Sequence, residues 1–100
     1  MGEDYAGGST ITTSSSNQVI SPNRLGRRIS ISITNYGTNT AWLMLSSNQP
    51  AAVGYGIPLY VGETITDSSS DVYQCWQGAV ACIQAAAGTT TLSVWERVQL

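Results

Sequence analysis

Hydrophobic and polar residues alternate most clearly along residues 28–35. Ile29, Ile31 and Ile33 are each followed by a serine or threonine. This period of two places β-branched side chains on one face of a strand and hydroxyls on the other. The pattern predicts a strand with one buried face, and all three isoleucines are expected in the core.

Other segments also favour strands. Residues 41–45 are apolar on both faces, as in a strand that is covered on both sides. Residues 57–61 alternate but contain a proline, which cannot donate to a ladder and therefore indicates an edge strand. In residues 92–98, Leu92 and Val94 are expected to face inward. Three short candidates are residues 10–12, 18–20 and 64–66, and residues 72–84 form a longer candidate that is interrupted at its glycine.

Turn residues recur roughly every ten positions, and no segment has a helical period. The chain is therefore predicted to be all-β, a compact β-sandwich or small barrel of seven to eight short antiparallel strands. Residues 1–17 are rich in Gly, Ser and Thr, so we expect them to form an extended N-terminal arm. Residues 18–100 are expected to form the single β-sandwich domain.

The composition argues against catalysis. The chain has no histidine and its four basic residues are all arginines, so a nucleophile would lack its usual bases. The six acidic residues lie mostly in turns or in the arm. Two cysteines without histidine do not complete a usual zinc site, and the Asp67–Asp71 loop is interpreted as a solvated turn. We therefore expect no enzyme activity, no cofactor and no metal.

Charge and hydropathy argue against two classes of partner, nucleic acid and membrane. The net charge is −2, which provides no broad basic field for nucleic acid. No apolar stretch approaches the 18 or so residues that a membrane helix needs. The acidic N-terminus lacks an apolar run, so we expect synthesis in a cytoplasm without a signal peptide.

The cysteines, Cys75 and Cys82, are seven residues apart. On one continuous strand they would point to opposite faces, so we expect two buried free thiols. A tight turn at Gly78 would instead allow them to pair.

Three arginines, Arg24, Arg27 and Arg28, cluster before the clearest strand. They are candidates for contact with a partner protein. The alternative is ordinary pairing within the chain, with Glu63, Asp67 or Glu96.

Aromatic and aliphatic residues supply further interface candidates. Tyr36 and Tyr55 stand beside turn glycines and are expected to be exposed. Trp42 and Trp76 lie inside strand-like runs and are expected in the core. In the arm, the anchors would be Tyr5 and Ile11.

Residues 17–96 carry a recognisable order of motifs. An arginine and an asparagine bracket the alternating isoleucines, and residues 54–59 read Gly-Tyr-Gly-Ile-Pro-Leu before a Gly-Glu pair. Residues 76–83 then read Trp-Gln-Gly-Ala-Val-Ala-Cys-Ile, and residues 92–96 read Leu-Ser-Val-Trp-Glu. This order resembles the small β-sandwich virion proteins of tailed bacteriophages, which include head decoration or cement proteins and related head-fibre or tail domains.

The resemblance implies a non-enzymatic structural protein of the virion, made in the bacterial host cytoplasm. The leading expectation is a capsid decoration protein that binds and stabilises the assembled head, as a homo-oligomer on the particle, with the arm extending the contact. One alternative is a receptor- or glycan-binding module of a tail or fibre. Another is a structural subunit of the tail or connector.

Overall fold

The computed structural model describes residues 4–12, 18–45, 54, 56–84 and 90–99, and for residues 4–12 it describes the course of the backbone. The described residues form eight strands. Their bounds are β1 Asp4–Thr12, β2 Gln18–Ser21, β3 Arg28–Asn35, β4 Ala41–Met44, β5 Ile57–Leu59, β6 Thr64–Ser68, β7 Val80–Gln84 and β8 Thr91–Gln99. Within these ranges no helix is long and apolar enough to cross a membrane.

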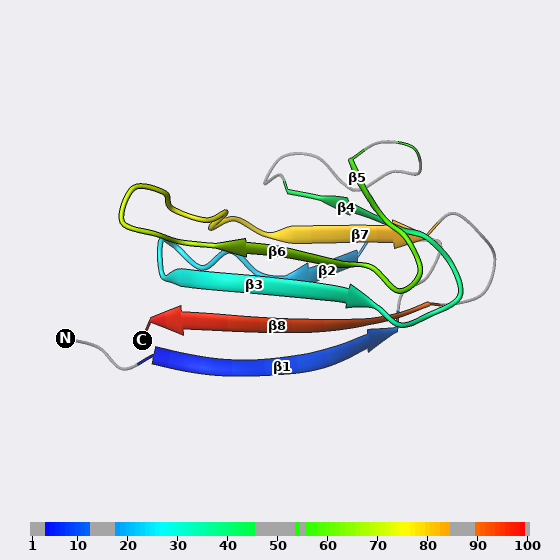
Figure 1. Cartoon of the computed structure of the whole chain (residues 1–100), viewed down its shortest axis with the longest axis horizontal. Helices are drawn as coiled ribbons and strands as arrows, with labels where there is room; N and C mark the ends of the chain where they lie inside the picture. Colours follow the sequence, from blue (N-terminus) through cyan, green and yellow to red (C-terminus); the bar gives the residue numbers. More distant parts are fainter. Residues whose placement is uncertain (1–3, 13–17, 46–53, 55, 85–89, 100) are drawn as a thin grey trace.

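The strands form two four-stranded sheets that face each other (Figure 1). The first, called sheet I, has the order β1-β8-β3-β6, and the second, called sheet II, has the order β2-β7-β4-β5. All pairings are antiparallel. This interleaved order is that of an eight-stranded jelly roll. The all-β prediction is confirmed, and the architecture is a β-sandwich. The predicted edge position of the proline-containing strand is also confirmed, because β5 ends sheet II.

The N-terminal segment is extended, as expected, but it is part of the sandwich. Strand β1 pairs with β8 along its whole length, from Asp4 opposite Gln99 to Thr12 opposite Thr91. Backbone pairing needs no apolar side chains, so a Gly-, Ser- and Thr-rich segment can add to a sheet edge. The predicted division at residue 17 therefore does not separate an arm from the sheets.

The core lies between the two sheets. Ile31 and Ile33 of β3 are 5% and 3% exposed, and both meet buried residues of β4, β7 and β8. The buried members of this cluster are Ile20, Ile31, Ile33, Ala41, Leu43, Leu59, Val80, Cys82, Leu92 and Val94. The predicted inward positions of Leu92 and Val94 are confirmed. Period-two alternation thus identified the core face of sheet I.

Ile29 departs from the predicted pattern. Between Arg28 and Ser30 the register against β8 shifts by one residue, which forms a β-bulge. The bulge places Arg28 in the buried position, at 2% exposure, and leaves Ile29 half-buried. The prediction of three buried isoleucines is therefore wrong for Ile29.

The C-terminal end of β3 is held by a buried asparagine. The Asn35 amide donates to the backbone oxygens of Asn39 at 2.8 Å and Leu59 at 3.0 Å. Its Oδ1 accepts hydrogen bonds from the Gly37 N–H and the Thr90 hydroxyl. One buried side chain therefore supplies hydrogen bonds to the loop that leaves β3 and to the loop that enters β8.

The predicted strand over residues 72–84 begins only at Val80. Residues 69–79 form a loop, called the 69–79 loop. In it the Trp76 indole donates to the Ala79 oxygen at 3.0 Å. A side chain at Gly78 would collide with that indole, so the close approach requires glycine. Trp76 is half-buried against the core, as expected.

Cys75 and Cys82 are both free and buried. Cys75 lies in the 69–79 loop, where its thiol donates to the Arg28 backbone oxygen at 3.3 Å. Cys82 lies on β7 in the core, and burial raises its pKa to about 11. Their local structures differ because the strand does not extend back to Cys75.

The packing of β3 supports a matched stability test. Ile31→Ala removes a buried side chain and should lower the free energy of unfolding by about 2–5 kcal/mol. Ser32→Ala changes a neighbour on the opposite face and should cost less than about 1 kcal/mol. Urea denaturation followed by fluorescence measures both, and equal losses would contradict the face assignment.

Candidate interaction site at one end of the sandwich

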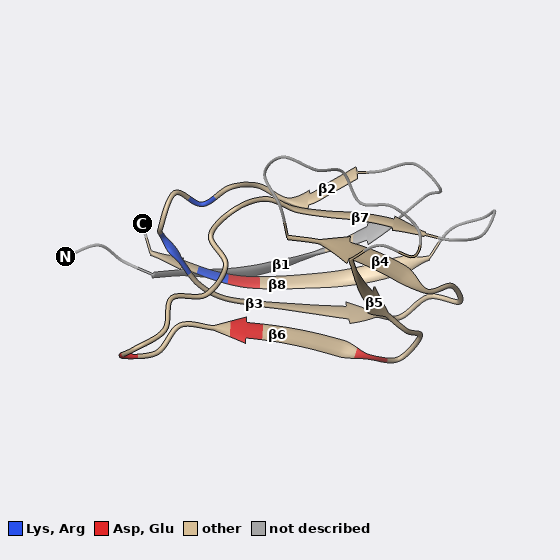
Figure 2. Cartoon of the chain, turned by 90° about the horizontal axis from the view of Figure 1, so that it is seen from above, with Lys and Arg blue, Asp and Glu red and all other residues tan. Residues whose placement is uncertain are grey.

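Two loops meet at the end of the sandwich where β3 begins and β8 ends (Figure 1). They are the 69–79 loop and the turn at residues 22–27, called the 22–27 turn. All four arginines of the chain lie in this half of the molecule (Figure 2). A buried polar network beneath the loops determines their positions.

Arg28 is the centre of this network, and its side chain is fully buried. Its Nε donates to Glu96 Oε2 at 2.9 Å. Its Nη atoms donate to the oxygens of Trp76 at 2.7 Å, Gly78 at 2.9 Å, Ser21 Oγ at 2.7 Å and Pro22 at 3.0 Å. All five N–H donors of the guanidinium are therefore satisfied. One side chain thus links β3, β8, the end of β2 and the 69–79 loop.

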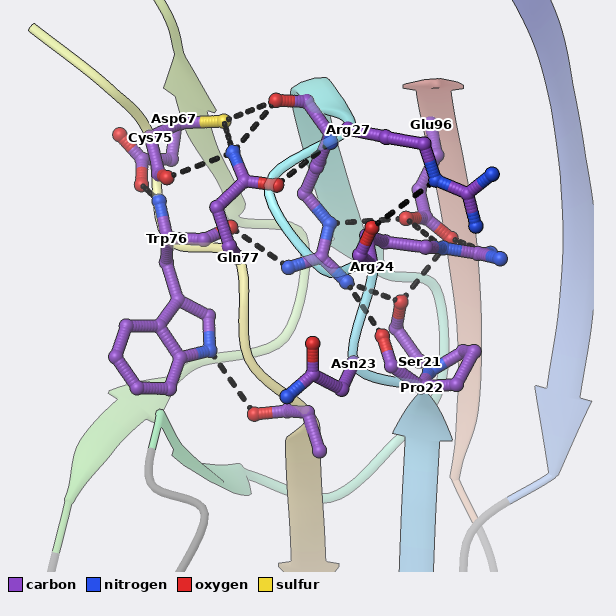
Figure 3. Close-up of polar contacts among 12 residues, drawn as sticks. Ser21, Pro22, Asn23, Arg24, Arg27, Asp67, Cys75, Trp76, Gln77 and Glu96 are labelled. Atoms are coloured by element: carbon purple, nitrogen blue, oxygen red, sulfur yellow. Dashed lines mark hydrogen bonds and ion pairs between the residues drawn. The ribbon is translucent and has the colours of Figure 1, made fainter. Parts of the chain in front are cut away.

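Glu96 balances this buried charge from the inward face of β8. It also accepts hydrogen bonds from Arg24, at 2.8 Å and 3.1 Å, and from the Ser21 hydroxyl at 3.0 Å (Figure 3). Burial alone would raise the pKa of Glu96. The hydrogen bonds from Arg24, Arg28 and Ser21 and the charge of Arg24 outweigh burial, so the pKa lies below its ordinary value.

The Gln77 side chain takes the place of a neighbouring strand at the bulge. Its Oε1 accepts from the Arg28 N–H at 2.6 Å, and its Nε2 donates to the Arg28 oxygen at 2.7 Å. Asp67 of β6 holds the same loop, because it accepts from the Trp76 N–H at 2.9 Å and from the Tyr73 hydroxyl at 2.8 Å. The hydrogen bond to Asp67 raises the pKa of Tyr73. The 69–79 loop is thereby fixed at several points.

These contacts bear on both interpretations of the arginine cluster. Arg24 and Arg28 both bind Glu96, as the pairing alternative predicted. Arg28 cannot contact a partner, because its side chain is buried. Arg27 is exposed, and its Nε donates to the Arg24 oxygen at 3.4 Å. Glu96 thus offsets one of the three positive charges of the cluster.

The 22–27 turn carries backbone strain at its tip. Leu25 and Gly26 have φ angles of 58° and 87°, and the Arg27 N–H donates to the Arg24 oxygen at 3.2 Å. Positive φ at both central residues indicates a type I′ turn, which prefers Asn, Asp or Gly. The Asn23 side chain accepts from the Leu25 N–H at 2.8 Å and supports the turn. Leucine in this conformation costs about 1–2 kcal/mol.

Three large apolar side chains are exposed on these two loops: Leu25, Val72 and Tyr73, at 78%, 96% and 51%. We call them the end patch. An open groove of about 480 Å³ adjoins the patch and is lined by both loops, with Arg27 and Asp71 among its walls. The combination of apolar tips and mixed charge is chemically suited to a protein partner.

The other predicted interface residues are dispersed. Tyr36 is 71% exposed, as expected, but it directly follows the last residue of β3, whereas the end patch lies where β3 begins; Figure 1 shows the two ends of this strand. Tyr5 and Ile11 lie opposite the buried residues Val98 and Leu92 in the register. The side chains of Tyr5 and Ile11, and the whole of Tyr55, lie outside the described part of the chain.

Sequence reasoning missed the end patch and the exposed Trp95. Val72 and Tyr73 were included in a predicted strand, and Leu25 stands among arginines without a pattern of its own. For Trp95 a signal was present, because Leu92 and Val94 face inward and the alternation turns the next residue outward.

Metal chemistry has no support among the described residues, which contain no group of three potential ligands. The Asp67 carboxylate already serves Trp76 and Tyr73. Asp67 lies on β6 and binds residues outside the 67–71 segment, so the structure does not place it in the predicted solvated turn.

No protein-family model matches the chain, and no curated protein matches it by sequence. Among solved structures the chain is similar to a protein of the Bacillus endospore appendages, which form a novel family of disulfide-linked pili. The TM-score is 0.58 at 16% identity, over 98% of this chain and 88% of that chain. At this identity the likeness concerns the fold alone.

The ion pair predicts acid sensitivity. An unfolded glutamate has a pKa of about 4.3, and the folded pKa of Glu96 is lower. Its contribution to stability is therefore present above about pH 4.3 and is lost as the pH falls through the folded pKa. Urea midpoints measured from pH 7 to 3 should fall steeply below that point.

Glu96→Gln should lower the free energy of unfolding by about 3–5 kcal/mol at pH 7, and its urea midpoint should depend less on pH below that point. The exposed control Asp71→Asn should show the same steep loss of stability at low pH as the original chain. If Glu96→Gln also showed that loss unchanged, Glu96 would not be its cause.

The strained turn predicts a stabilising substitution. Leu25→Asn replaces a leucine at positive φ with a residue that tolerates this conformation, and Leu25 is 78% exposed. The free energy of unfolding of the variant should therefore rise by about 0.5–1 kcal/mol. The measurement is a higher urea midpoint with an unchanged dependence of this free energy on urea concentration. Val61→Asn is a control, because Val61 is exposed and is not among the positive-φ residues. An equal gain in both would contradict relief of strain at Leu25.

Proposed function

We propose that this chain is a non-enzymatic structural protein that docks on a larger protein assembly through the end patch and the adjoining groove. The proposal rests on the exposure of Leu25, Val72 and Tyr73 on two loops that hydrogen bonds of Arg24, Arg28 and Asp67 hold in place. Exposed apolar groups on a rigid support bind with little loss of conformational entropy. Among the described residues, the buried polar groups of this end bind one another and leave no evident nucleophile and base pair.

In this proposal the assembly is a phage head and the chain is a decoration protein, as the resemblance to tailed-phage virion proteins implies. The jelly-roll fold, which many capsid domains share, is compatible with that proposal. The strain at Leu25 supports a functional role for the tip, because Asn or Gly would suit the same turn better. Docking of the folded domain would stabilise the assembled shell by mass action.

A pilus-like or fibre subunit is the second candidate. It is favoured by the fold-level likeness to a pilus protein, which extends over 98% of this chain. The chain contains two cysteines, and both are buried at 1% and 0% exposure. A fibre of folded copies would therefore be held by non-covalent contacts and not by disulfides between them.

The docking proposal is tested on phage heads assembled without this protein. The purified chain should bind these heads, and immunogold labelling of complete virions should mark the head. Val72→Ser with Leu25→Asn should weaken binding at least tenfold, about 1.4 kcal/mol, while the domain stays folded. Tyr36→Ser, just beyond the other end of β3, is the matched control and should bind like the original chain.

Three results would contradict this proposal in different ways. Label on the tail would favour the tail or fibre alternative. Unchanged binding of the double variant would move the interface away from the end patch. Polymerisation of the purified chain into filaments, with no binding to heads, would favour the fibre subunit.

A further inference from the structure

The outer face of sheet I differs from the rest of the surface. The outward positions of β3 and β6 are all hydroxyl residues: Ser30, Ser32, Thr34, Thr64, Thr66 and Ser68. Two cross-strand pairs are hydrogen-bonded, Ser32 to Thr66 at 3.0 Å and Thr34 to Thr64 at 2.7 Å. These six positions carry no charged side chain, whereas Arg97 of β8, the register partner of Ser30, places a charge on the same face next to the Trp95 position.

Trp95 stands on this face with its side chain outward from β8, and it is 51% exposed. Its register partners are Gly8 on β1 and Ser32 on β3. A glycine and a serine are both small neighbours for a cross-strand pair. The cross-strand partners of Trp95 are therefore small, while Ser93 and Arg97 are its neighbours along β8 on the same face, and about half of the Trp95 side chain is exposed.

A single row across the sheet runs Gly8, Trp95, Ser32 and Thr66. Adjacent strands are about 4.8 Å apart, so the backbones of Ser32 and Thr66 lie about one and two strand spacings from the backbone of Trp95. In the Ser32–Thr66 pair one hydroxyl hydrogen is used between the two oxygens. The other hydrogen and the remaining lone pairs are left for a ligand.

We propose that this face, called the Trp95 row, binds an uncharged carbohydrate chain. The apolar face of one pyranose ring stacks on the indole, and the hydroxyls of the next ring exchange hydrogen bonds with Ser32 and Thr66. A ligand of this class combines an apolar ring face with neutral hydroxyls, which are the two features that the row offers. The row is separate from the end patch, so the site does not depend on the proposed docking function.

A structural role for Trp95 makes a different prediction. An aromatic side chain opposite a glycine can shield the backbone of an edge strand. In that case Trp95→Ser would destabilise the domain, and the original chain would not bind sugar. For the carbohydrate site, Trp95→Ser should abolish sugar binding while the urea midpoint changes little.

The test uses NMR of the full-length chain, which has three tryptophan indole N–H signals. Neutral hexasaccharides of glucose, N-acetylglucosamine, xylose and mannose are titrated to 20 mM. The Trp95 signal, assigned by its absence in Trp95→Ser, should shift with a Kd near the millimolar range for at least one sugar. Ser32→Ala with Thr66→Ala should weaken that binding about fivefold or more, and Tyr36→Ser should leave it unchanged.

Several outcomes would overturn the proposal. One is the absence of any shift of the Trp95 signal with all four sugars at 20 mM. Another is sugar binding that survives in Trp95→Ser. A third is a Trp95 shift that depends on protein concentration alone, which would make the row a contact between copies of this chain. A loss of stability in Trp95→Ser, without sugar binding by the original chain, would assign the indole to shielding Gly8.

Discussion

The buried ion pair between Arg28 and Glu96 is the interaction on which this end of the sandwich depends. A guanidinium without water must have all of its donors satisfied, and Arg28 satisfies them with one carboxylate, one hydroxyl and three backbone oxygens. Those acceptors come from three separate segments, at residues 21–22, at residues 76–78 and at Glu96. The loops therefore take the positions that the guanidinium requires.

The consequence is a fixed platform made of irregular chain. Loops without such contacts are commonly the most mobile parts of a β-sandwich. Here Gln77 pairs with the Arg28 backbone, and Asp67 holds both Trp76 and Tyr73. The polar network itself offers no open site. Its effect on function, as we propose it, is to hold the apolar tips above it.

The two proposed surfaces follow from different kinds of local structure. The end patch consists of loop residues, among them a leucine in a conformation that leucine disfavours. The Trp95 row consists of regular strand positions, where the alternation of β8 turns one indole outward between small cross-strand partners. They occupy different parts of the molecule, so one can be altered while the other is kept.

Local pattern alone determined that this protein is all-β, that β5 lies at an edge, and that Ile31 and Ile33 face the core. Those features depend on neighbours one or two residues away, through strand alternation and the missing N–H of proline. The partners of Arg28, the bulge at Ile29 and the pairing of β1 were decided by tertiary structure. Glu96 is 68 residues from Arg28, and β1 meets β8 from the other end of the chain. Only the folded sandwich brings such groups together, because their attraction depends on their distance in space and on the exclusion of water. The local alternation of residues contains no information on either.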